Sequence, residues 1–413
     1  MERGPGFSSS LRDLPKFLSL AAIGSGVVAW FFAATKALVI MAAGGQAKLS
    51  PEVVALWIFI IYLTAGIASL FFTLYYRQPI SVAWTIPGAI LIGEALQHMN
   101  FNEAVGAYIM TGVLVLVLGM SGLVKWAIKW VPLPVMMGMV AGVLMPFGIS
   151  IVTAFPAIPA AAIVTFGVFI GLTLLPKVSA KLPPTLAALV VGLVAVTALG
   201  EAKWAKLAWH LPPIHLFAPT FSANGFFELA IPLTLMVIGV QNVQAIGVLL
   251  AEGYRPPVTA FTTWSGVGSL VNSLLGGHPM CIAGPTTAIL ADPGSGPKEG
   301  RYASGVINAI LWAVFALFSA VAVSLTKVVP MGLITLLGGL AMLGVLVSTF
   351  REAFSGKFRL GAMFAFLISV SNVTFFRVGA PFWALVGGVV ISLLLERADF
   401  KQSASPSQGV ALR

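Results

Sequence analysis

The chain has 413 residues, of which 59% are apolar and only 9% carry a formal charge. An ordinary soluble domain is about 45–50% apolar and about 25% charged, so this composition excludes a water-soluble fold. The apolar residues also run in stretches long enough, at about 1.5 Å per residue, to cross the roughly 30 Å of hydrocarbon in a bilayer. The sequence therefore predicts an all-α polytopic membrane protein.

Other compositional features exclude several functions. The single cysteine, Cys281, excludes an intramolecular disulfide and a cysteine metal cluster, and the four histidines lack ligand spacing, so we expect neither a metal nor a cofactor. Although the net charge is +10, the basic residues are scattered singly and form no run that would bind nucleic acid. An enzyme would need a nucleophile–base pair or a metal at membrane depth, and we find no such catalytic residues.

The apolar stretches divide into two sets of seven on either side of the polar stretch 200–224. The first set lies near 18–45, 53–76, 79–96, 103–130, 133–155, 158–176 and 183–199. The second set lies near 226–250, 258–276, 279–292, 302–328, 331–350, 359–374 and 379–396. The first stretch has spanning length and leads into further spans, so it is expected to serve as an uncleaved insertion signal.

The distribution of positive charge orients these fourteen spans. With the N-terminus inside, 17 of the 23 Lys and Arg residues face the cytoplasm, five face the opposite side and Lys36 falls within the first span. This is the bias that the positive-inside rule predicts. We therefore expect a multi-pass protein of the bacterial inner membrane, surrounded by lipid, with both termini in the cytoplasm.

A weak internal repeat relates the two halves. Ala89-Ile90-Leu91 matches Ala288-Ile289-Leu290, and Ala104 and Gly106 match Ala303 and Gly305 with the same offset. Because each half has an odd number of spans, the halves would have opposite orientations in the membrane. This 7+7 inverted repeat is a known transporter architecture.

The third span of each half, segments 3 and 10, is predicted to be broken. Residues 79–88 and 276–287 are rich in proline and glycine, with an extended piece followed by an apolar run that begins at Pro87 or Pro285. Proline is favoured in the first turn of a helix. Two half-helices meeting at mid-membrane would direct free N–H groups and positive dipole ends into one cavity, which suits an anion. The alternative is that these residues only kink ordinary helices.

Polar and aromatic side chains inside the spans could complete such a site. Gln241 and Gln244 are three residues apart, on one helical face, and either bind substrate or cross-link helices. Ser25 belongs to a Gly-Ser-Gly run close to Phe31, and Trp84 lies in the first extended piece. These aromatic residues would suit an aromatic substrate, although packing is the simpler explanation for Phe31.

Proton coupling usually needs a carboxylate within the membrane. The candidates are Glu94, Asp292 and Glu228, which all lie near span ends. Lys36 is the one cation well inside a span, and snorkelling towards the surface is its favoured interpretation.

Three runs carry a resemblance to a known family. PISVAWTIPGAIL (79–91), GVQNVQAIGVL (239–249) and GGHPMCIAGPTTAIL (276–290) resemble the bacterial benzoate membrane transport protein family over residues 15–397. The resemblance implies proton-coupled benzoate uptake and the fold of nucleobase-cation symporters and sulfate permeases. It also implies a core (15–131 and 225–330) that moves against a gate (132–199 and 331–397), with a tail at 398–413.

The chain departs from the nucleobase symporters at one informative position. Gly276, Pro279 and Gly284 match the lead-in to their second half-helix, but the acid that follows in those proteins is Pro285 here. A buried carboxylate would repel an anion, so its absence favours an anionic substrate. The expected substrate-binding residues are Ser25, Phe31, Trp84, Thr85, Pro87, Gly88, Gln241, Gln244, Gly284, Pro285, Thr286 and Thr287.

The expected partners are a benzoate-like anion and protons. The alternatives on the same fold are a transporter of another anion, such as sulfate or bicarbonate, or of a nucleobase. The Gly- and Ala-rich gate spans also permit a homodimer.

Overall fold

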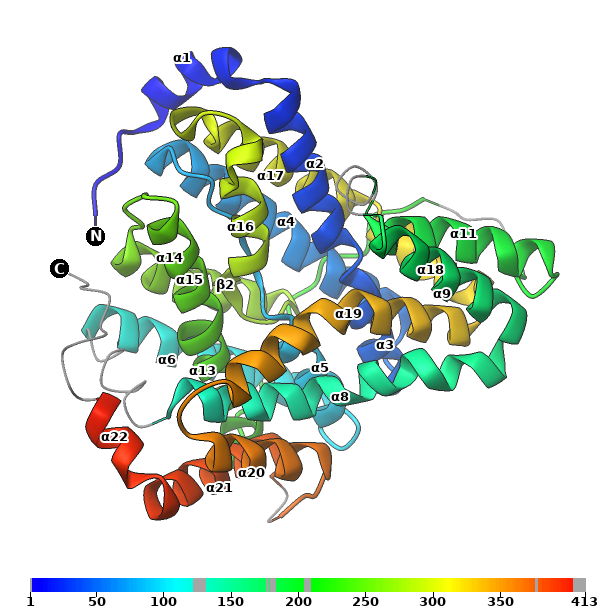
Figure 1. Cartoon of the computed structure of the whole chain (residues 1–413), viewed down its shortest axis with the longest axis vertical. Helices are drawn as coiled ribbons and strands as arrows, with labels where there is room; N and C mark the ends of the chain where they lie inside the picture. The colour runs from blue at the N-terminus through cyan, green and yellow to red at the C-terminus, as the bar shows by residue number, and fades with distance from the viewer. Residues whose placement is uncertain are drawn as a thin grey trace.

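A computed structural model describes residues 2–121, 131–175, 178, 183–203, 209–375 and 378–403. It is mostly helical (Figure 1). The first half contains α1 (Phe7–Phe17), α2 (Leu20–Ala34), α3 (Ala37–Gln46), α4 (Pro51–Tyr76), β1 (Val82–Trp84), α5 (Ile86–Ala95), α6 (Phe101–Ser121), α8 (Leu133–Ala157), α9 (Pro159–Thr173) and α11 (Pro184–Ala198).

The second half begins with α12 (Ala223–Gly225), the π-helical segment η1 (Phe226–Ala230), α13 (Ile231–Leu235), a second π-helical segment η2 (Met236–Asn242) and α14 (Val243–Ala251). It continues with α15 (Val258–Leu274), β2 (Met280–Ile282), α16 (Gly284–Ala291) and the 3-10 turns η3 (Pro293–Ser295) and η4 (Lys298–Gly300). The remaining helices are α17 (Tyr302–Leu317), α18 (Ser319–Val328), α19 (Met331–Phe354), α20 (Arg359–Val370), α21 (Ala380–Leu395) and α22 (Arg397–Ser403). Residues 404–413 of the expected tail lie outside the described residues.

Within the described residues, seven helices are long and apolar enough to cross a membrane, so the chain is a multi-pass membrane protein. The count of fourteen spans and the inverted repeat stay predictions. One reason is length: α5 has 10 residues, which extend only about 15 Å as a helix. Such an element cannot span hydrocarbon by itself.

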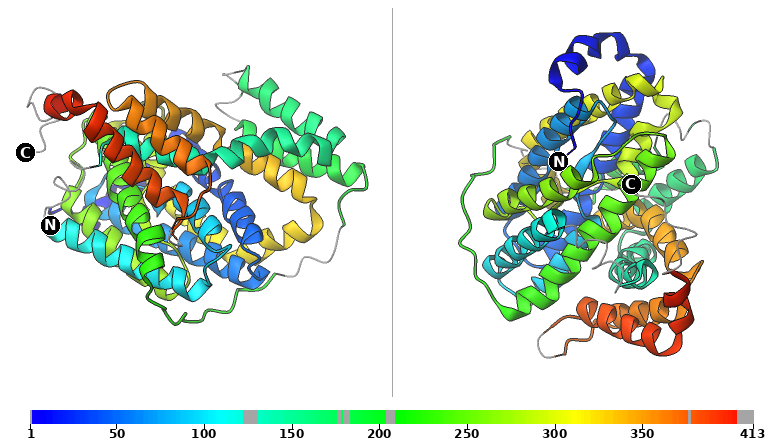
Figure 2. Two further views of the ribbon diagram at one scale, coloured as in Figure 1. Left: turned by 90° about the horizontal axis from the view of Figure 1, so that it is seen from below. Right: turned by 90° about the vertical axis from the view of Figure 1, so that its left-hand side faces the viewer.

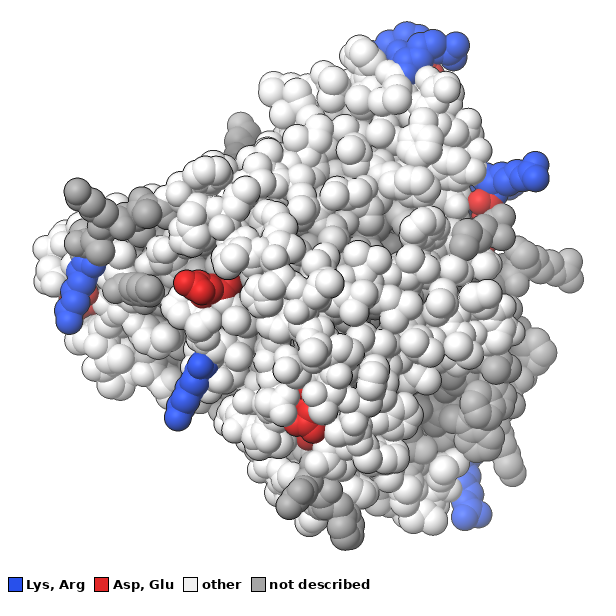
Figure 3. Space-filling view, turned by 180° about the vertical axis from the view of Figure 1, so that it is seen from behind, with Lys and Arg blue, Asp and Glu red and all other residues white. Residues whose placement is uncertain are grey.

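The long helices pack as pairs. Helix α8 packs against α19 and α20, α20 packs against α21, and α9 packs against α11. Separately, α4 packs against α17, α6 against α15, and α2 against α17 and α16. Figures 1 and 2 show α20 and α21 outside α8, away from α4 and α17. A face of the molecule carries few charged side chains over a broad area (Figure 3), as expected for contact with lipid.

The N-terminal segment is anchored to one end of this helical body. Asp13 of α1 forms an ion pair with Arg77 after α4, at 3.0 Å. Glu2 accepts hydrogen bonds from the backbone N–H groups of Thr259 and Ala260, at 2.9 and 3.1 Å, and so caps the start of α15. The N-terminus, the end of α4 and the start of α15 therefore lie at the same end of the molecule.

Candidate functional site

Two short strands bring the first turns of α5 and α16 together. Strands β1 and β2 pair antiparallel, with Val82 opposite Ile282 and Trp84 opposite Met280. Each strand leads within two residues into a short helix, α5 or α16. Antiparallel pairing of the two lead-in segments therefore places the two helical N-termini on either side of the same small sheet.

Buried polar side chains fix this sheet to the surrounding helices. Asn242 accepts a hydrogen bond from the backbone N–H of Ile282 at 2.8 Å and donates one to Ser265 Oγ at 3.2 Å. The Thr287 hydroxyl accepts from the backbone N–H of Ser81 at 3.2 Å. Extended backbone inside a membrane needs such partners, because no water is present to satisfy its N–H and C=O groups.

The two helical N-termini differ in capping. Thr85 precedes α5, and its hydroxyl accepts a hydrogen bond from the backbone N–H of Gly88 at 3.3 Å. Ala283 precedes α16 and has no side chain that can cap it. The first N–H groups of a helix have no partner within the helix. The N-terminus of α16 is therefore the more open of the two to an anionic ligand.

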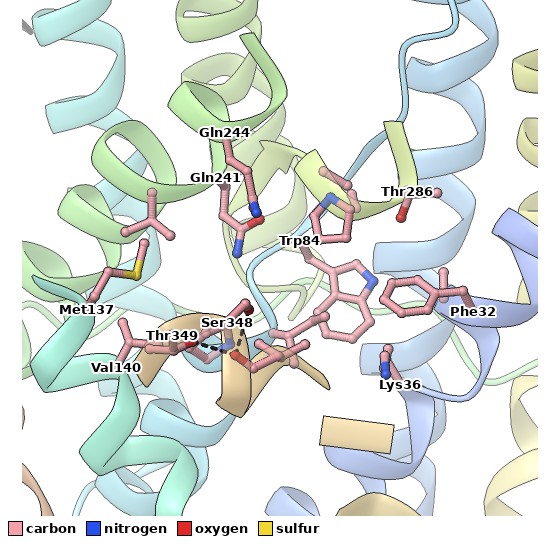
Figure 4. Close-up of a pocket in the computed structure, with 18 of the residues that line it drawn as sticks. Phe32, Lys36, Trp84, Met137, Val140, Gln241, Gln244, Thr286, Ser348 and Thr349 are labelled. Carbon is pink, nitrogen blue, oxygen red and sulfur yellow. Dashed lines mark hydrogen bonds between the residues drawn. The ribbon is translucent and has the colours of Figure 1, made fainter. Parts of the chain in front are cut away.

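A cavity lies at these N-termini (Figure 4). Its walls come from α2, the break before α3, β1, α5, η2, α14, α16, α17, α8 and α19. The lining residues are Phe32, Ala33, Lys36, Ala83, Trp84, Ile86, Pro87, Met137, Val140, Val240, Gln241, Gln244, Ala283, Pro285, Thr286, Trp312, Val345, Ser348, Thr349 and Glu352.

Three polar side chains of the cavity wall have free hydrogen-bonding capacity. Within the described part of the chain, Gln241, Gln244 and Thr286 make no side-chain hydrogen bond to another residue. Gln241 belongs to the π-helical segment η2, a local widening that is frequent at functional sites. Within the described residues, neither glutamine forms the side-chain hydrogen bond that cross-linking two helices would require.

Aromatic side chains form the apolar part of the wall. The Trp84 ring is fixed edge-on by Tyr62 and His278, with ring centroids at 5.8 and 5.4 Å. His278 is itself held, because its Nδ1 accepts from Trp57 Nε1 at 2.9 Å and its Nε2 lies 3.3 Å from the Thr85 carbonyl oxygen. Trp84 is therefore a rigid surface beside the polar groups, suited to stacking with a planar ring.

Of the expected substrate-binding residues, the structure brings Trp84, Pro87, Gln241, Gln244, Pro285 and Thr286 to this cavity. Four others, Thr85, Gly88, Gly284 and Thr287, lie next to the lining residues without lining the cavity. The Thr85 hydroxyl accepts from the Gly88 N–H, Gly284 packs against Gln244, and the Thr287 hydroxyl accepts from the Ser81 N–H. Phe31 instead lines a separate apolar cavity with Leu189 and Leu333, and Phe32 takes the place at the candidate site. Ser25 is half-buried on α2 and reaches neither.

Lys36 shows that snorkelling is the wrong interpretation. It lies in the break between α2 and α3, is only 3% exposed, and lines the candidate cavity. Its ammonium donates to the Ala341 carbonyl of α19 and lies 4.5 Å from the centroid of the Phe32 ring. Hydropathy alone does not predict the burial of Lys36, because a lysine in a span has the same hydropathy value whether it faces lipid, water or protein.

The candidate proton-coupling acids lie elsewhere. Glu228 is 2% exposed, and its Oε1 lies 2.9 Å from His98 Nε2, while its Oε2 has no partner among the described residues. Glu94, at the far end of α5, lines the same small polar cavity as Glu228 and His98. Asp292 is exposed and caps a turn by accepting from the Gly294 N–H at 2.7 Å.

The sequence interpretation missed several residues that the structure places at these two cavities. His98 lines the polar cavity beside Glu228, and Ser348, Thr349 and Glu352 of α19 line the candidate cavity. The three α19 residues belong to a segment with no polar motif, so only the packing of α19 across the cavity identifies them.

Solved structures with a similar fold include one titled a bicarbonate transporter and one titled an anion transporter. The transmembrane domain of the cyanobacterium bicarbonate transporter BicA aligns with a TM-score of 0.59 and 15% identity, over 91% of this chain and 97% of that one. SLC26A9 aligns with a TM-score of 0.60 and 14% identity, over 95% of this chain and 68% of that one. At such identities the similarity establishes the fold alone.

Sequence comparison is more specific. The inner membrane protein YdcO of Escherichia coli is 29% identical over 370 residues, covering 88% of this chain and 94% of that protein. The benzoate membrane transport protein of Acinetobacter baylyi is 27% identical over 391 residues, covering 93% and 98%. The model of the benzoate membrane transport protein family matches residues 16–394. The chain therefore belongs to the benzoate membrane transport protein family, a family of membrane transporters and not of enzymes.

Proposed function

We propose that this protein takes up benzoate or a related aromatic carboxylate across the bacterial inner membrane together with protons. The observation that carries the proposal is the cavity where the uncapped N-terminus of α16 faces Trp84, Gln241 and Gln244. The helix N-terminus and the amides suit a carboxylate, and the indole suits an aromatic ring. An inorganic anion has no ring that could stack on the indole of Trp84. A nucleobase would require an acidic residue at the position of Pro285.

The movement that we propose is alternating access of a core against a gate. The core would contain residues 15–131 and 225–330, and the gate residues 132–199 and 331–397, as an inverted repeat of 7+7 spans with both termini in the cytoplasm. The packing of α8 with α19 and α20, separate from that of α4 with α17, supports this division. The cavity would then lie at the boundary, since α8 and α19 line one side of it and α2, η2 and α16 the other.

The coupled proton would be carried near Glu228. This carboxyl is buried, pairs with His98 and lies against the backbone at the start of α21, because a Cβ on Gly379 would be 2.6 Å from Glu228 Oε1. Its protonation would thus alter a contact between the proposed core and gate. Glu94, in the same cavity, is the second candidate, whereas the exposed Asp292 is occupied in a turn.

The test is uptake of radiolabelled benzoate into proteoliposomes that contain the purified protein, with and without an inward proton gradient. We expect saturable uptake that the gradient accelerates and a protonophore abolishes, with no uptake into protein-free liposomes. Competition with unlabelled benzoate, sulfate, bicarbonate and uracil identifies the substrate class. Uptake that ignores the gradient would contradict symport, and competition by sulfate or uracil but not benzoate would contradict the substrate.

A further inference from the structure

Lys36 is a buried cation without a matching anion. Among the ion pairs of the described residues, none involves Lys36, although its side chain is almost fully buried. It has only the Ala341 carbonyl oxygen and the face of the Phe32 ring as partners. Taking an ammonium out of water is costly unless an opposite charge compensates it. A carbonyl and a ring provide partial charges, so the compensation is incomplete.

The position of Lys36 in the fold also favours a functional role. Lys36 interrupts the first span, with α2 ending at Ala34 and α3 beginning at Ala37. The break turns Lys36 towards the same cavity that Thr286, Gln241 and Trp84 line. Figure 4 shows the two glutamines at one end of the cavity and Lys36 at the other, with Trp84 between them.

We propose that Lys36 supplies the positive charge that binds the carboxylate of the substrate. This inference rests on the proposed function. It assigns a substrate-binding role to Lys36 that the resemblance to the family does not imply. A carboxylate has two oxygens with about four acceptor sites. The Lys36 ammonium would satisfy one side of it and the Thr286 hydroxyl and α16 N–H groups another, with Trp84 and Phe32 beside the ring.

The arrangement would provide selectivity as well as affinity. An anion beside a buried cation compensates its charge, and such a pair is far less costly than either buried charge alone. Glu352, at the exposed edge of the cavity, is the one acidic residue of the wall among those described. An uncharged ligand of the same shape would leave Lys36 uncompensated, so the site should discriminate benzoate from benzamide.

The experiment is calorimetric titration of the purified full-length protein with sodium benzoate and with benzamide. The variants are Lys36→Met, which removes the charge, and Lys36→Gln, which removes the charge but keeps a donor for Ala341. Lys48→Met is the matched control, because Lys48 is exposed just after the end of α3. We expect wild type and Lys48→Met to bind benzoate alike, and both Lys36 variants to bind it at least about 30-fold more weakly.

The outcomes separate the two proposals. If wild type binds benzoate and folded Lys36→Gln binds it equally well, the role of Lys36 is overturned while the substrate assignment stands. If wild type binds benzamide as tightly as benzoate, the role of the charge is overturned without reference to any variant. If wild type binds no aromatic carboxylate, the proposed function fails and this inference fails with it.

Discussion

Ser69 and Ser269 play the same part in the two halves of the chain. The Ser69 hydroxyl of α4 accepts the backbone N–H of Val82 at 2.8 Å, and the Ser269 hydroxyl of α15 accepts the backbone N–H of Met280 at 2.9 Å. Each serine thus fixes the strand that precedes a short helix. This correspondence supports the proposed repeat more directly than the sparse sequence identities do, because it is a relation of geometry.

Replacing either serine by alanine should destabilise the protein. Both side chains are fully buried, so the change leaves a backbone N–H without a partner in a dry environment. Leaving one buried donor unsatisfied costs about 1–3 kcal/mol. Thermal unfolding in detergent should show a lower Tm for Ser69→Ala and Ser269→Ala. Ser355→Ala, at an exposed position after α19, is the control, and an equal Tm in all three variants would contradict the role.

Gly284→Ala should weaken substrate binding. A Cβ at this position would lie 2.6 Å from both Cγ and Oε1 of Gln244, so the glutamine would have to move out of the cavity wall. Loss of one hydrogen bond to a charged ligand costs about 1.5–3 kcal/mol, or roughly 10- to 150-fold in affinity. Gly247→Ala on α14 meets nothing within 4 Å and serves as the control. The position is unimportant if benzoate titration gives both variants wild-type affinity.

Gln241→Leu and Thr286→Val test the polar wall directly. Both changes preserve approximate size, and both residues lack other hydrogen bonds in the described structure, so little stability should be lost. We expect each to weaken benzoate uptake by roughly tenfold or more, since each removes a donor to a carboxylate. Gln46→Leu, exposed at the end of α3, should transport normally. Wild-type uptake in both variants, at equal amounts of protein in the membrane, would remove them from the site.

The predicted breaks and the two glutamines rest on local signals in the sequence. Proline in a first helical turn and paired amides on one face are local signals, and Pro87, Pro285, Gln241 and Gln244 all reach the cavity. The burial of Lys36 at the cavity was not predicted, because it depends on which helix covers Lys36, here α19 from 305 residues further along the chain. No local pattern encodes that contact.

Phe32 lines the cavity in place of the predicted Phe31 for a similar reason. Adjacent residues of a helix point about 100° apart, so the rotation of α2 decides which ring faces the site. That rotation follows from how α2 packs on α16 and α17, a tertiary relation that a lone sequence does not carry. Thr287 illustrates the same limit, since its hydroxyl turns back to the Ser81 N–H instead of towards substrate.

Docking of α1 should weaken in acid. A hydrogen bond from Lys16 and the charge of Arg77 hold the pKa of Asp13 below its ordinary value of 3.8. Lys16 belongs to α1 itself, so only the part of the lowering that Arg77 causes depends on docking. That part of the stabilisation is fully present above 3.8 and is lost as the pH falls through the lowered pKa. The protection factors of the α1 amides, which correct exchange rates for the pH dependence of intrinsic exchange, should therefore fall at acidic pH. Asp13→Asn should show raised exchange already at neutral pH, whereas Glu299→Gln, at an exposed position, should not.

Glu228→Gln should uncouple transport from protons. The change keeps the size of the side chain and a partner for His98, but removes the group that we propose gains and loses the proton. Exchange of labelled for unlabelled benzoate at equal pH needs no net proton movement, so it should persist, whereas acceleration by an inward proton gradient should disappear. Glu52→Gln, exposed at the start of α4, should retain both activities.

A full response of Glu228→Gln to the gradient would move the proton site elsewhere. Glu94→Gln is then the next variant, because Glu94 lines the same polar cavity. Loss of exchange as well as gradient response would instead mean that Glu228 is needed for the movement itself, through its contact with the start of α21 at Gly379. Only the loss of coupling with exchange intact assigns the proton to Glu228, since a structural role would impair both activities together.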